Sequence, residues 1–150
     1  MKRKNQRGAA TVEVALVLPL LLALIFGVVQ FGWLVNNYLV LTNTASLAAH
    51  LLASERGYSS PYSDTQSVIT AQTRNLQGAL TVSIKVGSTS CTSDSACAAA
   101  LGSSTQAPVT GTQAQVQLSY SFVPLFGGSL YRLKSIMPGG LSATMSEFVQ

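Results

Sequence analysis

Apolar residues form one long run near the start of the chain. Residues 14–54 contain no Asp, Glu, Lys or Arg, and residues 14–35 have Gln30 as their only strongly polar side chain. A helix of about 20 apolar residues spans the ~30 Å hydrocarbon core of a bilayer. The run therefore predicts a transmembrane helix. Pro19 is compatible with it, because packing partners can re-satisfy the carbonyl that a proline frees.

The helical pattern continues beyond this run. Residues 36–54 lack Gly and Pro, and apolar residues recur at the spacing of one helix face at Leu41, Ala45, Ala48 and Leu52. Gly57 and Pro61 set the limit of the helix. A continuous helix over residues 14–54 would be about 60 Å long, with one half in lipid and the other packed on its own domain.

The remaining pattern predicts a small α+β domain. A second helix is expected over residues 64–77, capped by Ser63 or Asp64 and stopped by Gly78. Apolar and polar residues then alternate over residues 80–86 and 113–122, and a last strand is suggested by Leu141, Ala143 and Met145. Strands with one solvent-exposed face and one buried face are typical of an antiparallel sheet covered by helices. We expect three or four strands in this sheet.

Charge is concentrated at the N-terminus. Four of the nine basic residues precede Gly8, namely Lys2, Arg3, Lys4 and Arg7, and beyond Gly8 five basic residues balance five acidic ones. A nucleic-acid-binding domain needs a basic face rather than a basic tip, so nucleic acid is not an expected partner. The positive-inside rule places Met1 in the cytoplasm and the domain outside. The expected organisation is a leader at 1–8, a helix at 9–54 and a domain at 55–150.

The chain offers little for catalysis or metal binding. The domain has four acidic residues far apart in sequence, no histidine past residue 50, and none of the common catalytic or phosphate-binding motifs. We therefore expect neither an enzyme nor a cofactor or metal. The two cysteines, Cys91 and Cys97, lie in a Ser/Thr/Ala/Gly-rich connection at about 87–111. Outside the membrane oxidation persists, so a local disulfide is the favoured interpretation.

Glu13 is the only acid among the first 54 residues and stands at the start of the apolar run. A cleaved secretory signal is disfavoured, because its apolar region should run only about 7–15 residues. In a plain signal anchor, Glu13 would simply reach the headgroups. If the chain is instead cut after Gly8, the new ammonium of Ala9 and the carboxylate of Glu13 can neutralise each other, within one chain or between stacked helices.

Residues 7–22, RGAATVEVALVLPLLL, resemble the TadE-like pseudopilins of tight-adherence (Flp-type) pilus systems. The basic leader, the Gly before the cut, the Glu five residues after it and the Leu-Pro-Leu-Leu run match in order. The resemblance implies a pilin-like fold and cleavage between Gly8 and Ala9 by a membrane prepilin peptidase. It also implies that Glu13 serves processing, subunit alignment or both.

The resemblance further implies partners and a location. The partners are the membrane, the prepilin peptidase, other pilin or pseudopilin subunits, and an inner-membrane assembly platform with its ATPase. The location is the bacterial inner membrane with a single pass, a periplasmic or extracellular domain, and incorporation into a surface pilus as one possibility. The alternative is a permanently anchored extracytoplasmic scaffold or binding protein with an uncleaved signal anchor.

Two positions depart from the family pattern, and three others are expected to serve helix packing. Val14 stands where Phe is more common, and Gln30 where an acid is common, which leaves helix packing as the expected role of Gln30. Close helix approach is expected at Gly27 and Gly32, together with packing around Pro19.

Overall fold

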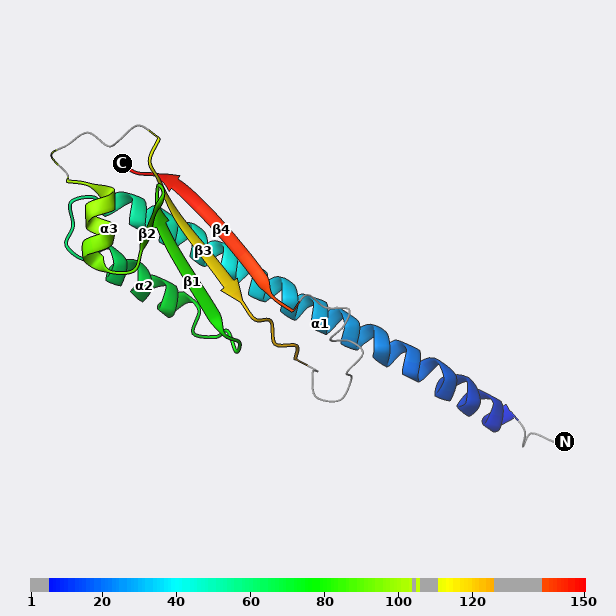
Figure 1. Cartoon of the computed structure of the whole chain (residues 1–150). Helices are drawn as coiled ribbons and strands as arrows, with labels where there is room; N and C mark the ends of the chain where they lie inside the picture. Colours follow the sequence, from blue (N-terminus) through cyan, green and yellow to red (C-terminus); the bar gives the residue numbers. More distant parts are fainter. Residues whose placement is uncertain (1–5, 104, 106–110, 126–138) are drawn as a thin grey trace.

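The computed structural model describes residues 6–103, 105, 111–125 and 139–150, with side chains from residue 11 onward. A long helix carries a small α+β domain on its C-terminal half, as Figure 1 shows. The predicted fold class is confirmed. The elements in chain order are α1 (Gln6–Ser54), α2 (Pro61–Gln72), β1 (Leu80–Val86), β2 (Thr89–Cys91), α3 (Asp94–Leu101), β3 (Gln113–Tyr120) and β4 (Leu141–Phe148).

Helix α1 is unbroken over 49 residues and contains Pro19. Proline has no N–H to donate to the carbonyl four residues earlier, that of Ala15, yet the helix continues on both sides. The helix ends at Ser54, and the following turn has Gly57 at a φ of 84°, a conformation that favours glycine. The single long helix expected from the sequence is confirmed, and it begins at Gln6.

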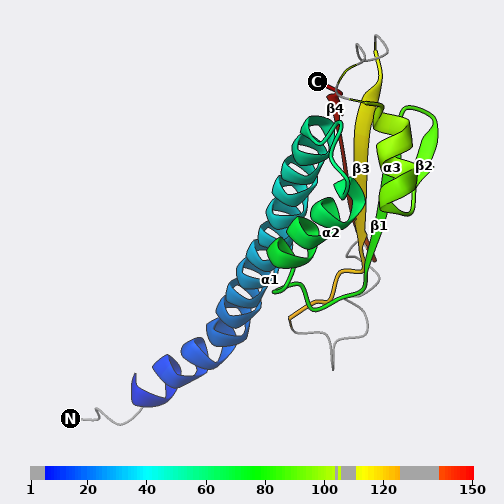
Figure 2. The same ribbon diagram turned by 90° about the vertical axis from the view of Figure 1, so that its left-hand side faces the viewer.

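The sheet has the strand order β2-β1-β3-β4, and every neighbouring pair is antiparallel. Helix α1 packs across β3 and β4, α3 packs on β2 and β1, and α2 lies against both helices. Figure 2, turned by 90°, shows α1 running beside the sheet and then far beyond it. β4 is an edge strand, which explains why Met145, on its helix-facing side, remains 37% exposed.

The core lies between the helices and one face of the sheet. On β3 the predicted alternation is confirmed: Ala114, Val116 and Leu118 are fully buried, whereas Gln113 and Gln117 are exposed. The registers join Ile84 to Val116 and Leu118 to Ala143, so the buried residues of three strands form one layer. The four residues predicted to face the domain from α1 are all 0% exposed, namely Leu41, Ala45, Ala48 and Leu52.

Two local predictions were wrong. The second helix spans Pro61–Gln72 rather than residues 64–77, because Pro61 occupies its first turn after Ser60 as N-cap. The segment predicted as an irregular connection contains β2 and α3. Helix α3 is rich in Ala, the best helix former, and the N-cap Ser93 accepts a hydrogen bond from the amide of Ala96 at 3.3 Å.

Gly78 has a different role from the predicted helix stop. A Cβ at this position would collide with the backbone carbonyl oxygen of Ser121. The amide of Ser121 donates to the carbonyl of Ala79 at 2.9 Å, which joins the start of β1 to the chain leaving β3. Glycine is therefore required at residue 78 by the close approach of two backbones.

Candidate membrane and assembly surface on the N-terminal helix

Helix α1 changes its surroundings at Gln30. Every residue from 11 to 29 is exposed, and we call this stretch the exposed half. From Gln30 to Ser54, the covered half, one face is packed on the domain (Figure 1). Its contact positions recur at intervals of three or four, and we call them the domain-facing stripe: Gln30, Leu34, Asn37, Leu41, Ala45, Ala48 and Leu52.

The first part of the stripe was missed in the sequence because two of its members are polar. Gln30 is 5% exposed, between Val29 at 43% and Phe31 at 65%, and Asn37 is 1% exposed. The side-chain amide nitrogen of Asn37 has no hydrogen-bond partner in the described part of the chain. The seven-residue interval between Gln30 and Asn37 is the signal that could have revealed a buried face, since it equals two helical turns.

Trp33 ties the helix to the chain that leaves β3. Its indole N–H donates to the backbone carbonyl of Val123 at 3.2 Å, and its ring packs against the core. A tryptophan joins an apolar ring to one polar donor, and here both are used on the domain. The indole of Trp33 thus has a fixed partner 90 residues further along the chain.

The exposed half contains 19 residues, about 28 Å of helix at 1.5 Å per residue. This length is close to the ~30 Å thickness of the hydrocarbon core. By length and composition, α1 from Thr11 to Ser54 is a candidate membrane-spanning helix, and its most apolar stretch is not buried by the domain.

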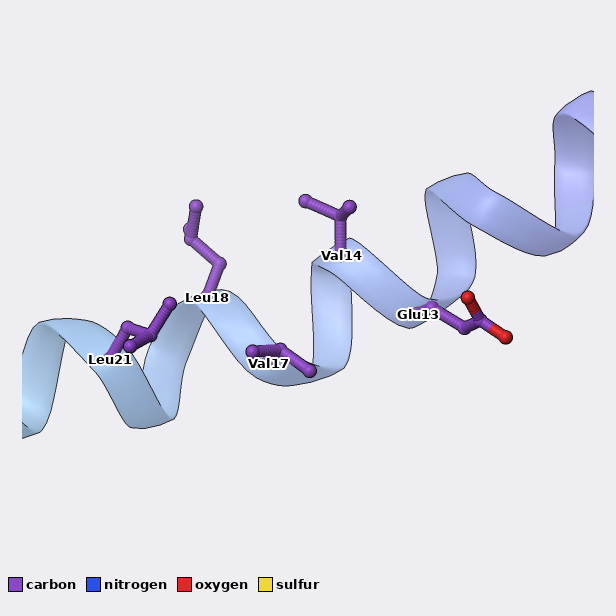
Figure 3. A pocket seen from close by; sticks show the side chains of 5 residues that line it. All are labelled: Glu13, Val14, Val17, Leu18 and Leu21. Carbon is purple, nitrogen blue, oxygen red and sulfur yellow. The ribbon is translucent and has the colours of Figure 1, made fainter.

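Glu13 stands at the N-terminal end of a shallow groove on this helix. Figure 3 shows the lining side chains, which are Glu13, Val14, Val17, Leu18 and Leu21. Offsets of one, four, five and eight residues from Glu13 place them on one side of the helix. The groove is almost wholly apolar, so it suits the apolar side chain of an adjacent helix, with one carboxylate at its edge.

The predicted cleavage site lies just before this groove. Gly8 and Ala9 belong to the helical backbone of α1. In a helix, Ala9 and Glu13 are four residues apart and share one face. Arg7 also lies in the helix, whereas the other predicted topology residues, Lys2, Arg3 and Lys4, lie outside the described residues.

The family model described as TadE-like protein matches residues 8–50. The matched residues all lie within α1, so this helix is similar to TadE-like proteins. This match confirms the resemblance drawn from Gly8, Glu13 and the Leu-Pro-Leu-Leu run. No curated protein and no solved structure matches the chain. The TadE-like match and the apolar helix together support a membrane protein associated with a tight-adherence pilus system.

Gly27 and Gly32 face open space on different sides of α1. A Cβ on Gly27 or Gly32 would meet nothing within 4 Å among the described residues. Five residues correspond to about 140° around a helix, so the two glycines do not share a face. Gly27 is seven residues, or two helical turns, before Leu34, so it lies in line with the domain-facing stripe but on its N-terminal side. Gly32 lies on the side of the helix that points away from the domain. Their predicted packing role, and that of Pro19, therefore concerns other helices.

The two cysteines meet inside the domain. Cys91 ends β2 and Cys97 lies in α3; both are buried free thiols. Burial raises the pKa of both thiols, and a hydrogen bond between them lowers the pKa of Cys91 while raising that of Cys97 further. The structure thus brings Cys91 and Cys97 together, as expected from the sequence, and the disulfide between them stays a prediction.

Three acids that are far apart in sequence gather at the end of the domain away from the exposed half. Glu55 is 8% exposed, and one of its carboxylate oxygens has no hydrogen-bond partner in the described residues. Burial, and then the nearby charges of Asp64 and Asp94, raise the pKa of Glu55. Asp64 accepts from the hydroxyl of Ser60 at 2.7 Å, and Asp94 accepts from the amide of Ser63 at 2.8 Å. Within the described ranges no group of three potential ligands is placed to hold a metal ion.

Proposed function

We propose that this chain is a membrane-inserted, pseudopilin or minor-pilin-like subunit for assembly of a tight-adherence pilus. The observation that carries the proposal is the division of one continuous TadE-like helix into an exposed apolar half and a half packed on a small α+β domain. A soluble protein would leave 19 consecutive exposed and mostly apolar residues in water, at a large hydrophobic cost. A bilayer removes that cost.

In this proposal the chain inserts once, with its basic leader in the cytoplasm. Lys2, Arg3, Lys4 and Arg7 provide the orientation signal of the positive-inside rule. The domain then lies on the periplasmic side of the inner membrane, where the subunit is available for incorporation into a pilus.

The proposed processing step creates a positive charge that can pair with the carboxylate of Glu13. Hydrolysis of the Gly8–Ala9 peptide bond by a prepilin peptidase would release residues 1–8 and leave an ammonium at the first residue of α1. The positive end of the helix dipole disfavours an ammonium there. A carboxylate one turn along the same face offsets both charges, in its own chain or on the next helix. This pairing would set the stagger between subunits.

Assembly would then depend on helix packing rather than on chemistry. The groove beside Glu13 and the open sides of Gly27 and Gly32 would receive the helices of other pilin subunits. The assembly platform and, indirectly, its ATPase would move the subunit. We propose no catalytic role, because the domain lacks a base and a nucleophile at recognisable spacing in its sequence.

The test is the intact mass of the protein from membranes with and without the cognate prepilin peptidase. We expect loss of residues 1–8 only when the peptidase is present. Gly8→Asp should abolish the loss, whereas the matched variant Ala10→Ser should leave it unchanged. A full-length chain in the presence of active peptidase contradicts the processing step.

A second variant separates the subunit from a permanently anchored scaffold. Glu13→Gln removes the charge and keeps the size of the side chain. We expect this variant to remain in the membrane but to co-purify with fewer pilin subunits. A scaffold with an uncleaved anchor would retain residues 1–8 and be indifferent to Glu13→Gln.

A further inference from the structure

We infer that the domain makes its own contact with the membrane, through the segment that leaves β3. This inference rests on the proposed membrane insertion of α1. The interfacial segment is residues 121–125, an irregular stretch directly after Tyr120. Its proposed partner is the headgroup layer of a phospholipid bilayer, together with the adjoining edge of the hydrocarbon core.

The first argument is the height of the segment along the helix. The exposed half ends at Val29, and the headgroup layer extends the membrane by about 5–8 Å on each side, which corresponds to about four residues of helix. Trp33 therefore lies in the headgroup layer. Because its indole N–H donates to the carbonyl of Val123, the interfacial segment is held at the same height.

The second argument is the direction of the segment. Figures 1 and 2 both show the chain after β3 continuing beside α1 toward the N-terminal end of the helix. Residues 124 and 125 therefore lie on the side of Val123 that faces the hydrocarbon core. The surface of the interfacial segment thus adjoins the surface that the bilayer covers.

The third argument is the chemistry of the side chains. Phe122 is directed into the core at 8% exposure, whereas Val123 is 39% and Leu125 is 49% exposed. Exposed apolar side chains flanking a tryptophan are typical of a surface that meets the membrane interface.

The same contact corrects the extent of the membrane span. A span over residues 14–35 would draw Trp33 and the Val123 carbonyl into the hydrocarbon core. Irregular backbone that faces lipid does not occur there, because its N–H and C=O groups lack partners. The span therefore ends near Val29 and begins near Thr11, which places Glu13 about 3 Å inside the cytoplasmic boundary.

The test uses tryptophan quenching by brominated lipids, since Trp33 is the only tryptophan in the chain. The full chain is reconstituted in phosphatidylcholine–phosphatidylglycerol vesicles that carry bromine either high or low on the acyl chains. We expect the shallow bromines to quench Trp33 more than the deep ones. Stronger quenching by the deep bromines would overturn the proposed height.

The segment itself is tested with a moved tryptophan. In the Trp33→Phe background, Leu125→Trp should be quenched by the shallow bromines and shift its emission to the blue. Tyr58→Trp in the same background is the matched control, because Tyr58 is 65% exposed and lies at the opposite end of the domain. We expect no quenching of that control.

A third measurement retains Trp33, in case its loss disturbs the domain. With the native indole in place, Leu125→Cys should react several-fold more slowly than Tyr58→Cys with a water-soluble maleimide in vesicles. The two rates should become similar in denaturant. Equal rates in vesicles would overturn the inference.

Failure of the inference is distinguishable from failure of the proposed function. If the chain floats with vesicles after an alkaline wash but Leu125→Trp is not quenched, the helix is inserted and the interfacial contact is wrong. If Leu125→Cys is protected without lipid quenching, a protein covers the segment and the lipid assignment is wrong. If the chain does not float, membrane insertion itself fails.

Discussion

The two halves of α1 are alike in lacking charge after Glu13, but one half is exposed and the other is covered by the domain. Neither half carries a charged residue between Val14 and Ser54. The exposed half presents large side chains on all sides, such as Leu16 at 77% and Leu20 at 72% exposure. The covered half buries small side chains among its large ones, with Ala45 and Ala48 at 0%. Small residues let a sheet approach the helix closely, whereas a lipid boundary requires only apolar surface.

The largest expected effect comes from truncating the covered half. Leu41→Ala removes a fully buried side chain and should lower the free energy of unfolding by about 2–5 kcal/mol, through lost burial and a cavity. The same change in the exposed half, Leu22→Ala, should leave domain stability unchanged. Urea titration in micelles, followed by Trp33 fluorescence, measures both. Equal losses would show that the two halves are not energetically distinct.

Two glycines, Gly78 in the domain and Gly32 on the side of α1 that points away from the domain, give the next comparison. Gly78→Ala should destabilise the domain by about 1–3 kcal/mol, because the added methyl forces the backbone of Ser121 away. Gly32→Ala meets open space and should not destabilise the isolated subunit. The same titration checks both variants. A neutral Gly78→Ala would mean that the two backbones separate at little cost.

The part of the domain farthest from α1 should depend on a covalent link instead. If Cys91 and Cys97 form the predicted disulfide, reduction should cost about 2 kcal/mol, as expected for a small ring. Non-reducing peptide mapping of protein from its native compartment checks the bond. Two alkylatable thiols would reject it. In the reduced form both thiols should react slowly until unfolding, because burial raises the pKa of each.

The smallest expected effect lies at the end of the covered half. Glu55→Gln removes an incompletely paired buried charge near two other acids, and should stabilise the protein at pH 7 by about 1 kcal/mol. Since the folded-state pKa of Glu55 is raised, the parent should gain stability as pH falls through that pKa toward 4.5, and the variant should lack this gain. Unfolding free energies of both proteins at pH 7 and pH 5 test this. Parallel pH dependences would remove Glu55 as the cause.

Much of the fold was predictable because its patterns are local. The β1 strand was predicted with its observed bounds, Leu80–Val86, and the alternation on β3 identified its buried face. The errors occurred where local signals compete. Pro61 starts α2 earlier than the polar residues suggested, and the Ala-rich α3 was hidden among loop-forming residues.

The candidate site divides in the same way. Glu13, Gly8 and the TadE-like character of the helix follow from residue type and order, and residues 8–50 match that family. The roles assigned to these residues remain predictions. Gln30 was assigned only to packing, and the structure shows it to be the first position covered by the domain.

The sequence by itself determined that one apolar helix precedes an amphipathic sheet, because hydrophobic period and charge distribution are properties of neighbouring residues. Only the tertiary structure decided where on that helix the exposed half gives way to the half covered by the domain. That boundary depends on a hydrogen bond between residues 90 positions apart, from Trp33 to Val123, and on the burial of Gln30 and Asn37. No local pattern encodes such contacts, since they form only when the sheet folds against the helix.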